Sequence, residues 1–194
     1  MTRGDRARQQ LEELEEVLRA VKSALASELE EVAQDVAEVL GRGGKLLFCG
    51  NGGSAADAQH LAAEYVIRFA AHREPLPALA LTTDTSVLTA GANDFGFDHV
   101  FSRQVEALGK EGDLLFLHST SGTSPNLLRA ADSARGKGIE TVAFLARDGG
   151  PLAGIVDRAV IVPTESTARA QEIHLTMGHI ICQMVEEEWV KGMP

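Results

Sequence analysis

The sequence predicts an α/β fold: a three-layer αβα sandwich on a five-stranded parallel sheet, with a helical segment at the N-terminus. Five short apolar runs, typical of strands buried on both faces, alternate with stretches of helical pattern. Helical crossovers between successive strands favour parallel pairing. Ligands are therefore expected beyond the carboxyl ends of the strands.

The N-terminal segment, residues 5–41, predicts one or two amphipathic helices. Apolar residues recur every three or four positions from Leu11 to Leu40, among many acids and few bases. No glycine or proline lies between Arg6 and Leu40, so the sequence does not show where a first helix would end. Because so long a stripe exceeds what one domain's core covers, it indicates an oligomer-building segment.

The remaining elements follow in alternation. The predicted strands are Lys45–Cys49, Ala78–Leu81, Leu114–His118, Glu140–Leu145 and Ala159–Val162. Helices are predicted at about 54–70, 98–108, 124–137, 149–155 and 167–191. No internal repeat, low-complexity tract or long linker interrupts the chain, so residues 1–194 are expected to form a single domain.

Composition narrows the class of protein. Eighteen basic against 28 acidic residues give a formal net charge of −10, which argues against a general nucleic-acid-binding surface and favours a small ligand. Neither a membrane span nor an apolar leader is visible. Cys49 and Cys182 show no metal or disulfide spacing. We therefore expect a cytoplasmic protein that does not bind a membrane.

A glycine-rich turn follows the first predicted strand, in the sequence CGNGGSAADAQHLAAE at residues 49–64. Its glycines permit close backbone approaches, while Asn51 and Ser54 offer hydrogen bonds and a helix N-cap. A helix N-terminus at a strand end suits polar or anionic groups. The pattern predicts a ligand site, although a purely structural strand-to-helix turn would look the same.

This turn differs from the common nucleotide-binding motifs. The dinucleotide motif G-x-G-x-x-G would need glycine at position 55, which is Ala55, and the lysine of a P-loop is missing. NAD and ATP are therefore weak candidates as ligands.

A second candidate site is the sequence HSTSGTSPNLLRAA at residues 118–131. A strand is expected to end at His118, and Pro125 suits the first turn of the next helix. The hydroxyls between them form a donor-rich cradle for a phosphate that needs no lysine. The alternative is a serine- and threonine-rich turn that only caps the helix.

Two helices carry residues suited to acid/base chemistry or to metal binding. His60 and Glu64 lie about 40° apart on one helical face. Gln171 and His179 project within about 80° of each other on the last helix. Such residues are more often surface pairs or satisfied core residues, but together they would suit zinc or a proton shuttle. His174 points away from His179 and is expected to be structural.

The segments CGNGGSAADAQH, STSGTS, GANDFGFDHVFSRQVEALGKEGD and ARAQEIH together resemble the sugar-isomerase (SIS) fold, and within it the phosphoheptose isomerase family. The resemblance covers nearly the whole chain. It implies conversion of sedoheptulose 7-phosphate into D-glycero-D-manno-heptose 7-phosphate, a precursor of bacterial surface glycans, by a homotetramer with one zinc ion per subunit.

Site residues follow from the resemblance position by position. It implies Glu64 and His179 as the catalytic acid/base pair. The implied zinc ligands are His60, Glu64, Gln171 and His179. The implied substrate contacts are Asn51, Gly52, Gly53, Glu64, Asn93, Asp94, Ser119, Thr120, Ser121, Ser124 and Gln171.

The chain departs from the family pattern at a few positions. Ala168 stands where some members carry aspartate, Tyr65-Val66-Ile67 replaces a more usual Leu-Thr-Gly, and His118 stands where a small or apolar residue is common. Two other functions remain open. One is a non-catalytic SIS tetramer that binds the bacterial replication initiator protein and lacks the acid/base pair. The other is a sugar-phosphate-sensing regulatory module, although no DNA-binding segment accompanies the domain.

Overall fold

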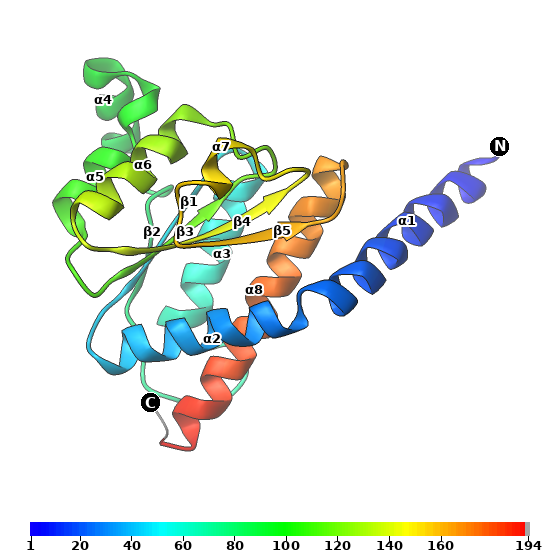
Figure 1. The fold of residues 1–194 in the computed structure, drawn as a ribbon, viewed down its shortest axis with the longest axis horizontal. Coiled ribbons are helices and arrows are strands. Elements are labelled where there is room, and N and C mark those ends of the chain that lie inside the picture. The colour runs from blue at the N-terminus through cyan, green and yellow to red at the C-terminus, as the bar shows by residue number, and fades with distance from the viewer. Residues whose placement is uncertain (193–194) are drawn as a thin grey trace.

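The core of the molecule is one parallel sheet. In the computed structural model, which describes residues 1–192, five strands pair in the order β2-β1-β3-β4-β5 (Figure 1). The predicted strands are confirmed, with ends that differ by at most one residue. Their bounds are β1 Leu46–Gly50, β2 Ala78–Ala80, β3 Leu114–His118, β4 Glu140–Ala146 and β5 Arg158–Val162.

The strand order reverses direction at β1. From β1 the chain moves outward to β2 and then returns to the other side of β1 to form β3. Crossovers that diverge from two neighbouring strands leave a crevice at their carboxyl ends, where ligands bind in open α/β sheets. The loops at that position follow β1 and β3, and these are the two turns that the sequence singled out.

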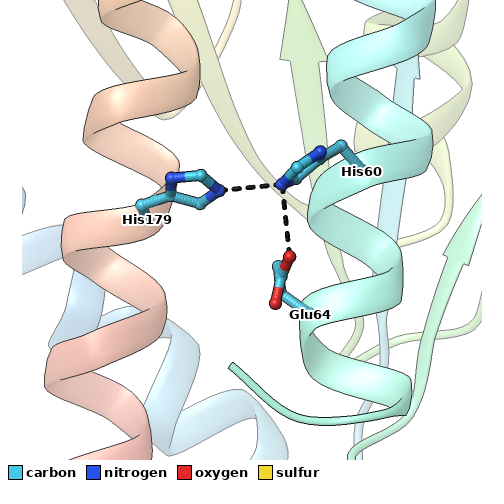
Figure 2. A group of neighbouring side chains, drawn as sticks. All are labelled: His60, Glu64 and His179. Carbon is cyan, nitrogen blue, oxygen red and sulfur yellow. Dashed lines mark hydrogen bonds and ion pairs between the residues drawn. The ribbon is translucent and has the colours of Figure 1, made fainter. Parts of the chain in front are cut away.

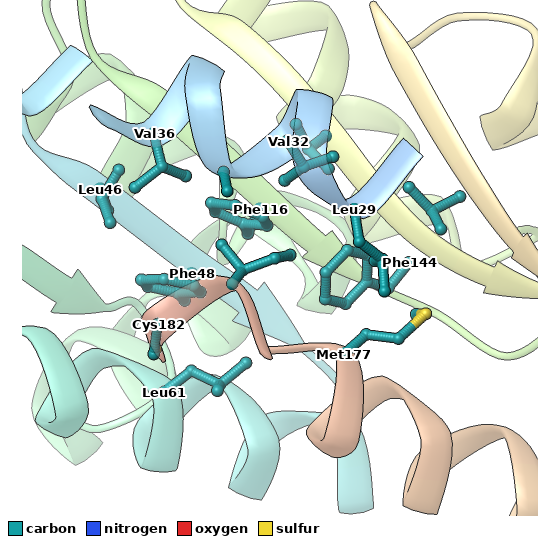
Figure 3. Packing of buried hydrophobic residues seen from close by; sticks show 14 of the residues in the cluster. Leu29, Val32, Val36, Leu46, Phe48, Leu61, Phe116, Phe144, Met177 and Cys182 are labelled. Atoms are coloured by element: carbon teal, nitrogen blue, oxygen red, sulfur yellow. The ribbon is translucent and has the colours of Figure 1, made fainter. Parts of the chain in front are cut away.

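Helices cover both faces of the sheet, as the predicted sandwich requires. One layer contains α2 Ala26–Gly41, α3 Gly53–Val66 and α8 Thr167–Val190, and the other contains α5 Ser102–Leu108, α6 Pro125–Gly136 and α7 Gly150–Ala153. Alternate residues of each strand face opposite helical layers. Phe48 and Phe116 face the layer of α2, α3 and α8, and their ring centroids are 4.9 Å apart (Figure 3). Leu47 and Leu115 face the layer of α5, α6 and α7.

The N-terminal segment forms two helices, α1 Arg3–Ala24 and α2, which meet at Leu25. Leu25 is buried and has φ −115° and ψ 0°, so an anchored side chain, and no glycine or proline, marks the break. α2 packs into the core through residues such as Val32 and Val36. α1 extends away from the body of the molecule (Figure 1), and only Val21 of this helix is buried.

Two helical predictions were wrong in extent. α3 ends at Val66 instead of position 70, because the chain turns back there to reach β2. The expected helix at 98–108 begins in the 3₁₀ turn η1 Phe97–His99, and the helix α4 Thr85–Phe95 was not predicted. No residue of α4 is fully buried, and only Leu88 and Ala92 of this helix pack in part against the core, so its apolar stripe is short.

None of the helices within residues 1–192 is both long enough and apolar enough to cross a lipid bilayer.

Candidate active site

The candidate site begins where two helices pass at close range. α3 supplies His60 and Glu64, α8 supplies His179, and all three side chains point into the space between the helices (Figure 2). A Cβ added to Gly178 would lie 2.5 Å from the side chain of Leu61 on α3. Any larger residue would force the helices apart. Gly178 therefore sets the distance across which the three side chains meet.

These three residues, called here the α3–α8 trio, converge on His60. Nε2 of His60 lies 2.9 Å from Nε2 of His179 and 3.2 Å from Oε1 of Glu64. One ligand atom from each residue lies within 4.8 Å of the other two, and within residues 1–192 this is the one such group of His, Cys, Asp or Glu. Two imidazole nitrogens and a carboxylate oxygen are a donor set that suits zinc.

The α3–α8 trio is partly open to solvent. The side chains of His60 and Glu64 are 45% and 22% exposed. Burial lowers the pKa of His179, His60 lowers it further, and Glu64 raises it only in part. At neutral pH the imidazole of His179 is therefore neutral, with one nitrogen available as an acceptor and the other as a donor.

Asp57 adjoins this face of α3 and was not singled out from the sequence. It precedes His60 by three residues, and its Oδ2 is buried without a hydrogen-bond partner among the described residues. Burial raises the pKa of Asp57 to about 6, although His60 lowers it in part. Its spacing from His60 is the signal that could have identified it.

Gln171, the fourth predicted metal ligand, lies on α8 and packs its side chain against the beginning of α3. A Cβ added to Gly53 would be 2.6 Å from Nε2 of Gln171, so the amide packs on the glycine-rich turn. Gly53 precedes His60 by seven residues, which is about 10 Å along a helix. The structure thus brings three of the four predicted ligands together and places Gln171 two turns away, beside Asn51–Gly53.

The turns after β1 and β3 are joined by two amides. Nδ2 of Asn51 donates to Oδ1 of Asn126 at 3.0 Å, and Nδ2 of Asn126 donates to Oδ1 of Asn51 at 2.9 Å. Asn126 is buried in the first turn of α6. This reciprocal pair fixes the glycine-rich turn against the serine-rich turn at the point where the strand order reverses.

The serine-rich turn curls over the N-terminus of α6. Oγ of Ser119 accepts the N–H of Gly122 at 3.0 Å, and Ser124 is the N-cap residue, with no side-chain capping bond. Gly122 has φ +63°, and a Cβ there would lie 1.9 Å from the carbonyl oxygen of Gly149, so only glycine fits. Ser119 and Ser121 thus flank a tight turn at a helix N-terminus, an arrangement suited to an anion.

Proteins of known family share this arrangement over most of the chain. The SIS domain family model matches residues 9–146. The phosphoheptose isomerase of Desulfovibrio desulfuricans is 58% identical over 161 residues, which is 83% of this chain and 77% of the relative. That of Paramagnetospirillum magneticum is 51% identical over 178 residues, 92% of this chain and 93% of the relative. The chain belongs to the phosphoheptose isomerase family of SIS domains. It is an isomerase.

A solved structure in this family has the same fold. The phosphoheptose isomerase of Neisseria gonorrhoeae superposes with a TM-score of 0.91 at 41% sequence identity, over 96% of this chain and 100% of that chain. The SIS fold predicted from the four sequence segments is therefore confirmed along nearly the entire chain.

Within this SIS fold, two predicted substrate contacts lie apart from the α3–α8 trio. Asn93 and Asp94 are on α4, where Nδ2 of Asn93 donates to Oδ1 of Asp94 at 2.7 Å. Figure 1 shows α4 at the edge of the molecule, well away from α8. A single chain therefore does not bring this pair to the trio.

Of the departures from the isomerase pattern, Tyr65 and His118 are buried, whereas Val66, Ile67 and Ala168 are exposed. Tyr65 is buried, with its ring 6.1 Å from that of Phe48, and Ala168 lies in the first turn of α8. His118 is buried beneath the serine-rich turn, 6.2 Å from the ring of His174. Both ring nitrogens of His118 lack a hydrogen-bond partner among the described residues. Burial, and then His174, lower the pKa of His118 to about 3.

Proposed function

We propose that the protein interconverts sedoheptulose 7-phosphate and D-glycero-D-manno-heptose 7-phosphate in the cytoplasm. The observation that carries this proposal is the convergence of Glu64 and His179 on His60, in a chain that belongs to the phosphoheptose isomerases. An aldose–ketose isomerisation removes a proton from the carbon beside the carbonyl and returns a proton to its neighbour. One carboxylate and one imidazole suffice for this exchange.

Glu64 shuttles the carbon-bound proton in the proposed mechanism, and His179 handles protons at the substrate oxygens and during ring opening. Glu64 is well suited, because its carboxylate is only 22% exposed yet reachable from solvent. His179 lies across the helix pair from Glu64, and a ligand atom of each lies within 4.8 Å of the other, so that both groups can reach the same end of one substrate. The pair distinguishes the chain from the non-catalytic SIS tetramers, which lack it.

The sugar phosphate is proposed to span from the α3–α8 trio to the two strand-end turns. Ser119, Thr120, Ser121 and Ser124 hold its phosphate through hydroxyls and helix amides, as the geometry of the serine-rich turn supports. Asn51, Gly52 and Gly53 contact the sugar beside Gln171. Holding the phosphate fixes which carbons meet Glu64 and His179.

Zinc belongs to the proposal as one ion per subunit. His60, Glu64 and His179 fit it by donor type and by proximity, whereas the predicted fourth ligand, Gln171, lies two helical turns away beside Gly53. When bound, the metal would polarise substrate oxygens as a Lewis acid. Elemental analysis of the purified protein should give about one zinc per chain, and a His60→Ala variant should retain much less.

The proposed assembly is a homotetramer formed through α1. Leu11 and Leu18 of this helix are 67% and 40% exposed, and a second copy would cover them. A tetramer also offers a way for Asn93 and Asp94 of one subunit to reach the site of another. A monomer mass from solution scattering at micromolar concentration would refute this assembly. Recovery of activity in mixed oligomers of Glu64 and His179 variants would show that sites are shared.

One experiment tests the reaction directly. Purified protein incubated with sedoheptulose 7-phosphate should form an aldoheptose phosphate, with exchange of the carbon-bound proton for solvent deuterium. Glu64→Gln should bind the sugar phosphate but lower turnover by about 10²- to 10⁴-fold. Excess zinc would restore much of the rate if Glu64 only held the metal. Near-normal turnover of this variant without added metal would reject both roles of Glu64 and favour a binding module.

A further inference from the structure

A buried ion pair, Arg73 and Glu186, connects the loop after α3 to α8. Arg73 lies in that loop, Glu186 lies seven residues after His179 on α8, and their side chains are only 4% and 5% exposed. Nε of Arg73 donates to Oε1 of Glu186 at 3.1 Å. A buried pair of this kind is weak evidence for stability, because desolvation of the two charges offsets their attraction. The other hydrogen bonds of Arg73 and Glu186 indicate the role of this pair.

The guanidinium of Arg73 closes the C-terminal end of α3. It donates to the carbonyl oxygen of Glu64 at 2.8 Å and to that of Tyr65 at 2.9 Å. The last carbonyls of a helix have no partner within the helix, so Arg73 supplies the missing donors. One of the two carbonyls belongs to the proposed proton shuttle itself. The backbone of Glu64 is therefore held directly by Arg73.

The carboxylate of Glu186 orders the loop. Its oxygens accept the N–H groups of Phe69, Ala70 and Ala71 at 2.7 to 3.0 Å, in addition to the bond from Arg73. Burial alone would raise the pKa of Glu186, but the N–H groups of Ala71, Ala70 and Phe69, and then Arg73, lower it below its usual value. Glu186 is thus held as an anion that gathers three successive amides.

Ordering of the loop places Phe69 against the second member of the acid/base pair. The ring of Phe69 lies 5.4 Å from the ring of His179, centroid to centroid, with an interplanar angle of 41°. The ring of His60 also lies close to the ring of His179, with 4.9 Å between the two centroids. Phe69 and His60 therefore flank the imidazole, and Phe69 depends on Glu186 for its position.

We propose that Arg73 and Glu186 are positioning residues of the isomerase, with Arg73 holding the backbone of Glu64 and Glu186 holding Phe69 against His179. This inference rests on the proposed function. Neither residue touches the substrate in this role. Both fix the separation between two groups on different helices, and an error of about 1 Å in such a separation can cost roughly 10²-fold in rate.

The first test replaces each residue conservatively. Arg73→Lys keeps the charge but loses the planar fork that reaches two carbonyls and a carboxylate together. Glu186→Gln keeps the shape but presents an amide that cannot accept all four donors. With sedoheptulose 7-phosphate and equal excess zinc, each should lower kcat by about 10- to 100-fold. KM should stay within about threefold, because the serine-rich turn that binds phosphate is elsewhere.

Removal of one buried partner can prevent folding, so a double variant is included. Arg73→Met with Glu186→Gln removes both charges and leaves no unpaired ion, while the new amide oxygen can still accept backbone N–H groups of the loop. Circular dichroism should show a folded protein, and kcat should fall as in the single variants. A folded double variant with the wild-type kcat would overturn the inference.

The control is a similar pair with a buried carboxylate, at the amino ends of β1 and β3. Asp113 is fully buried, pairs with Lys45, and accepts the backbone N–H groups of Lys45 and Lys110. Lys45→Met with Asp113→Met should cost stability but leave kcat within about twofold. An equal fall of kcat in this control would show general loosening and would also overturn the inference. Failure of the wild-type protein to isomerise the substrate would instead reject the proposed function.

Discussion

Two pairs of histidines lie along α8, which contributes one residue to each pair. His179 meets His60 in the open space between α3 and α8, where Glu64 joins them. His174, five residues earlier on the same helix, faces His118 inside the core. Both pairs combine one residue of α8 with one residue of another element. They differ in what surrounds them.

The surroundings decide what each pair can do. Burial, against some gain from the Leu145 carbonyl, lowers the pKa of His174 to about 4, and that of His118 is about 3. Neither ring can carry a proton near neutral pH, and no carboxylate contact is recorded for either of them among residues 1–192. The open pair has a carboxylate at 3.2 Å and contact with solvent. Histidine chemistry here follows from access and a charged partner, not from the presence of two rings.

The largest expected effect breaks the open pair. His179→Gln should lower kcat for sedoheptulose 7-phosphate by about 10²- to 10⁴-fold, because the amide cannot exchange protons. His174→Gln is the matched change on the same helix, where the new amide can still donate to the carbonyl of Leu145. It should change kcat by no more than about threefold. Equal losses in the two variants would remove the distinction between the pairs.

The next effect concerns the turn directly above the buried pair. Ser121→Ala with Ser124→Ala removes two hydroxyls from the proposed phosphate cradle. KM should rise by about 100-fold or more, since hydrogen bonds to charged groups are each worth about 1.5–3 kcal/mol. Ser133→Ala, in the last turns of α6, is the control and should leave KM unchanged. An unaltered KM in the double variant would mean that the phosphate binds elsewhere.

A third effect is the response of the buried pair to acid. The pKa values of His118 and His174 are lowered in the folded protein, to about 3 and about 4, from 6.5. Below pH 6.5 these two histidines therefore bind protons in the unfolded chain but stay neutral in the folded chain, which favours unfolding. The free energy of unfolding should fall by up to about 1.4 kcal/mol per pH unit for each histidine as pH drops from 6.5 towards 4.

Urea titrations at pH 7, 6 and 5 would measure this fall. The variant His118→Leu with His174→Gln should show a shallower decline than the wild-type protein. A decline that is equally steep in the variant would assign the acid sensitivity to other groups.

The smallest effect isolates His118 at neutral pH. His118→Leu removes two ring nitrogens that lack partners, so the free energy of unfolding at pH 7 should stay equal or rise by about 1 kcal/mol. Activity should not change, because His118 does not reach the trio. A marked fall in kcat would show that this ring supports the serine-rich turn after all.

The central strands β1, β3 and β4 could be predicted from the sequence alone, because burial of a strand on both faces requires a continuous apolar run, here of 5 to 7 residues. His60 and Glu64 could also be predicted to lie side by side, because residues four positions apart share one face of a helix. The helix α4 could not be identified in this way, because none of its residues is buried and its only strong signal is the cap at Asp84.

Contacts between elements that are distant in the sequence could be seen only in the folded structure. Spacing on α8 put Gln171 and His179 on one face, but the packing of α8 on α3 placed Gln171 beside Gly53 and His179 beside His60. Arg73 and Glu186 are 113 residues apart, and no local sequence pattern around either residue predicts that they form a pair. Periodicity acts over a few residues, whereas contacts between elements depend on how close two helices approach. Here Gly178 permits the close approach of α8 to α3, because it has no Cβ to collide with the side chain of Leu61.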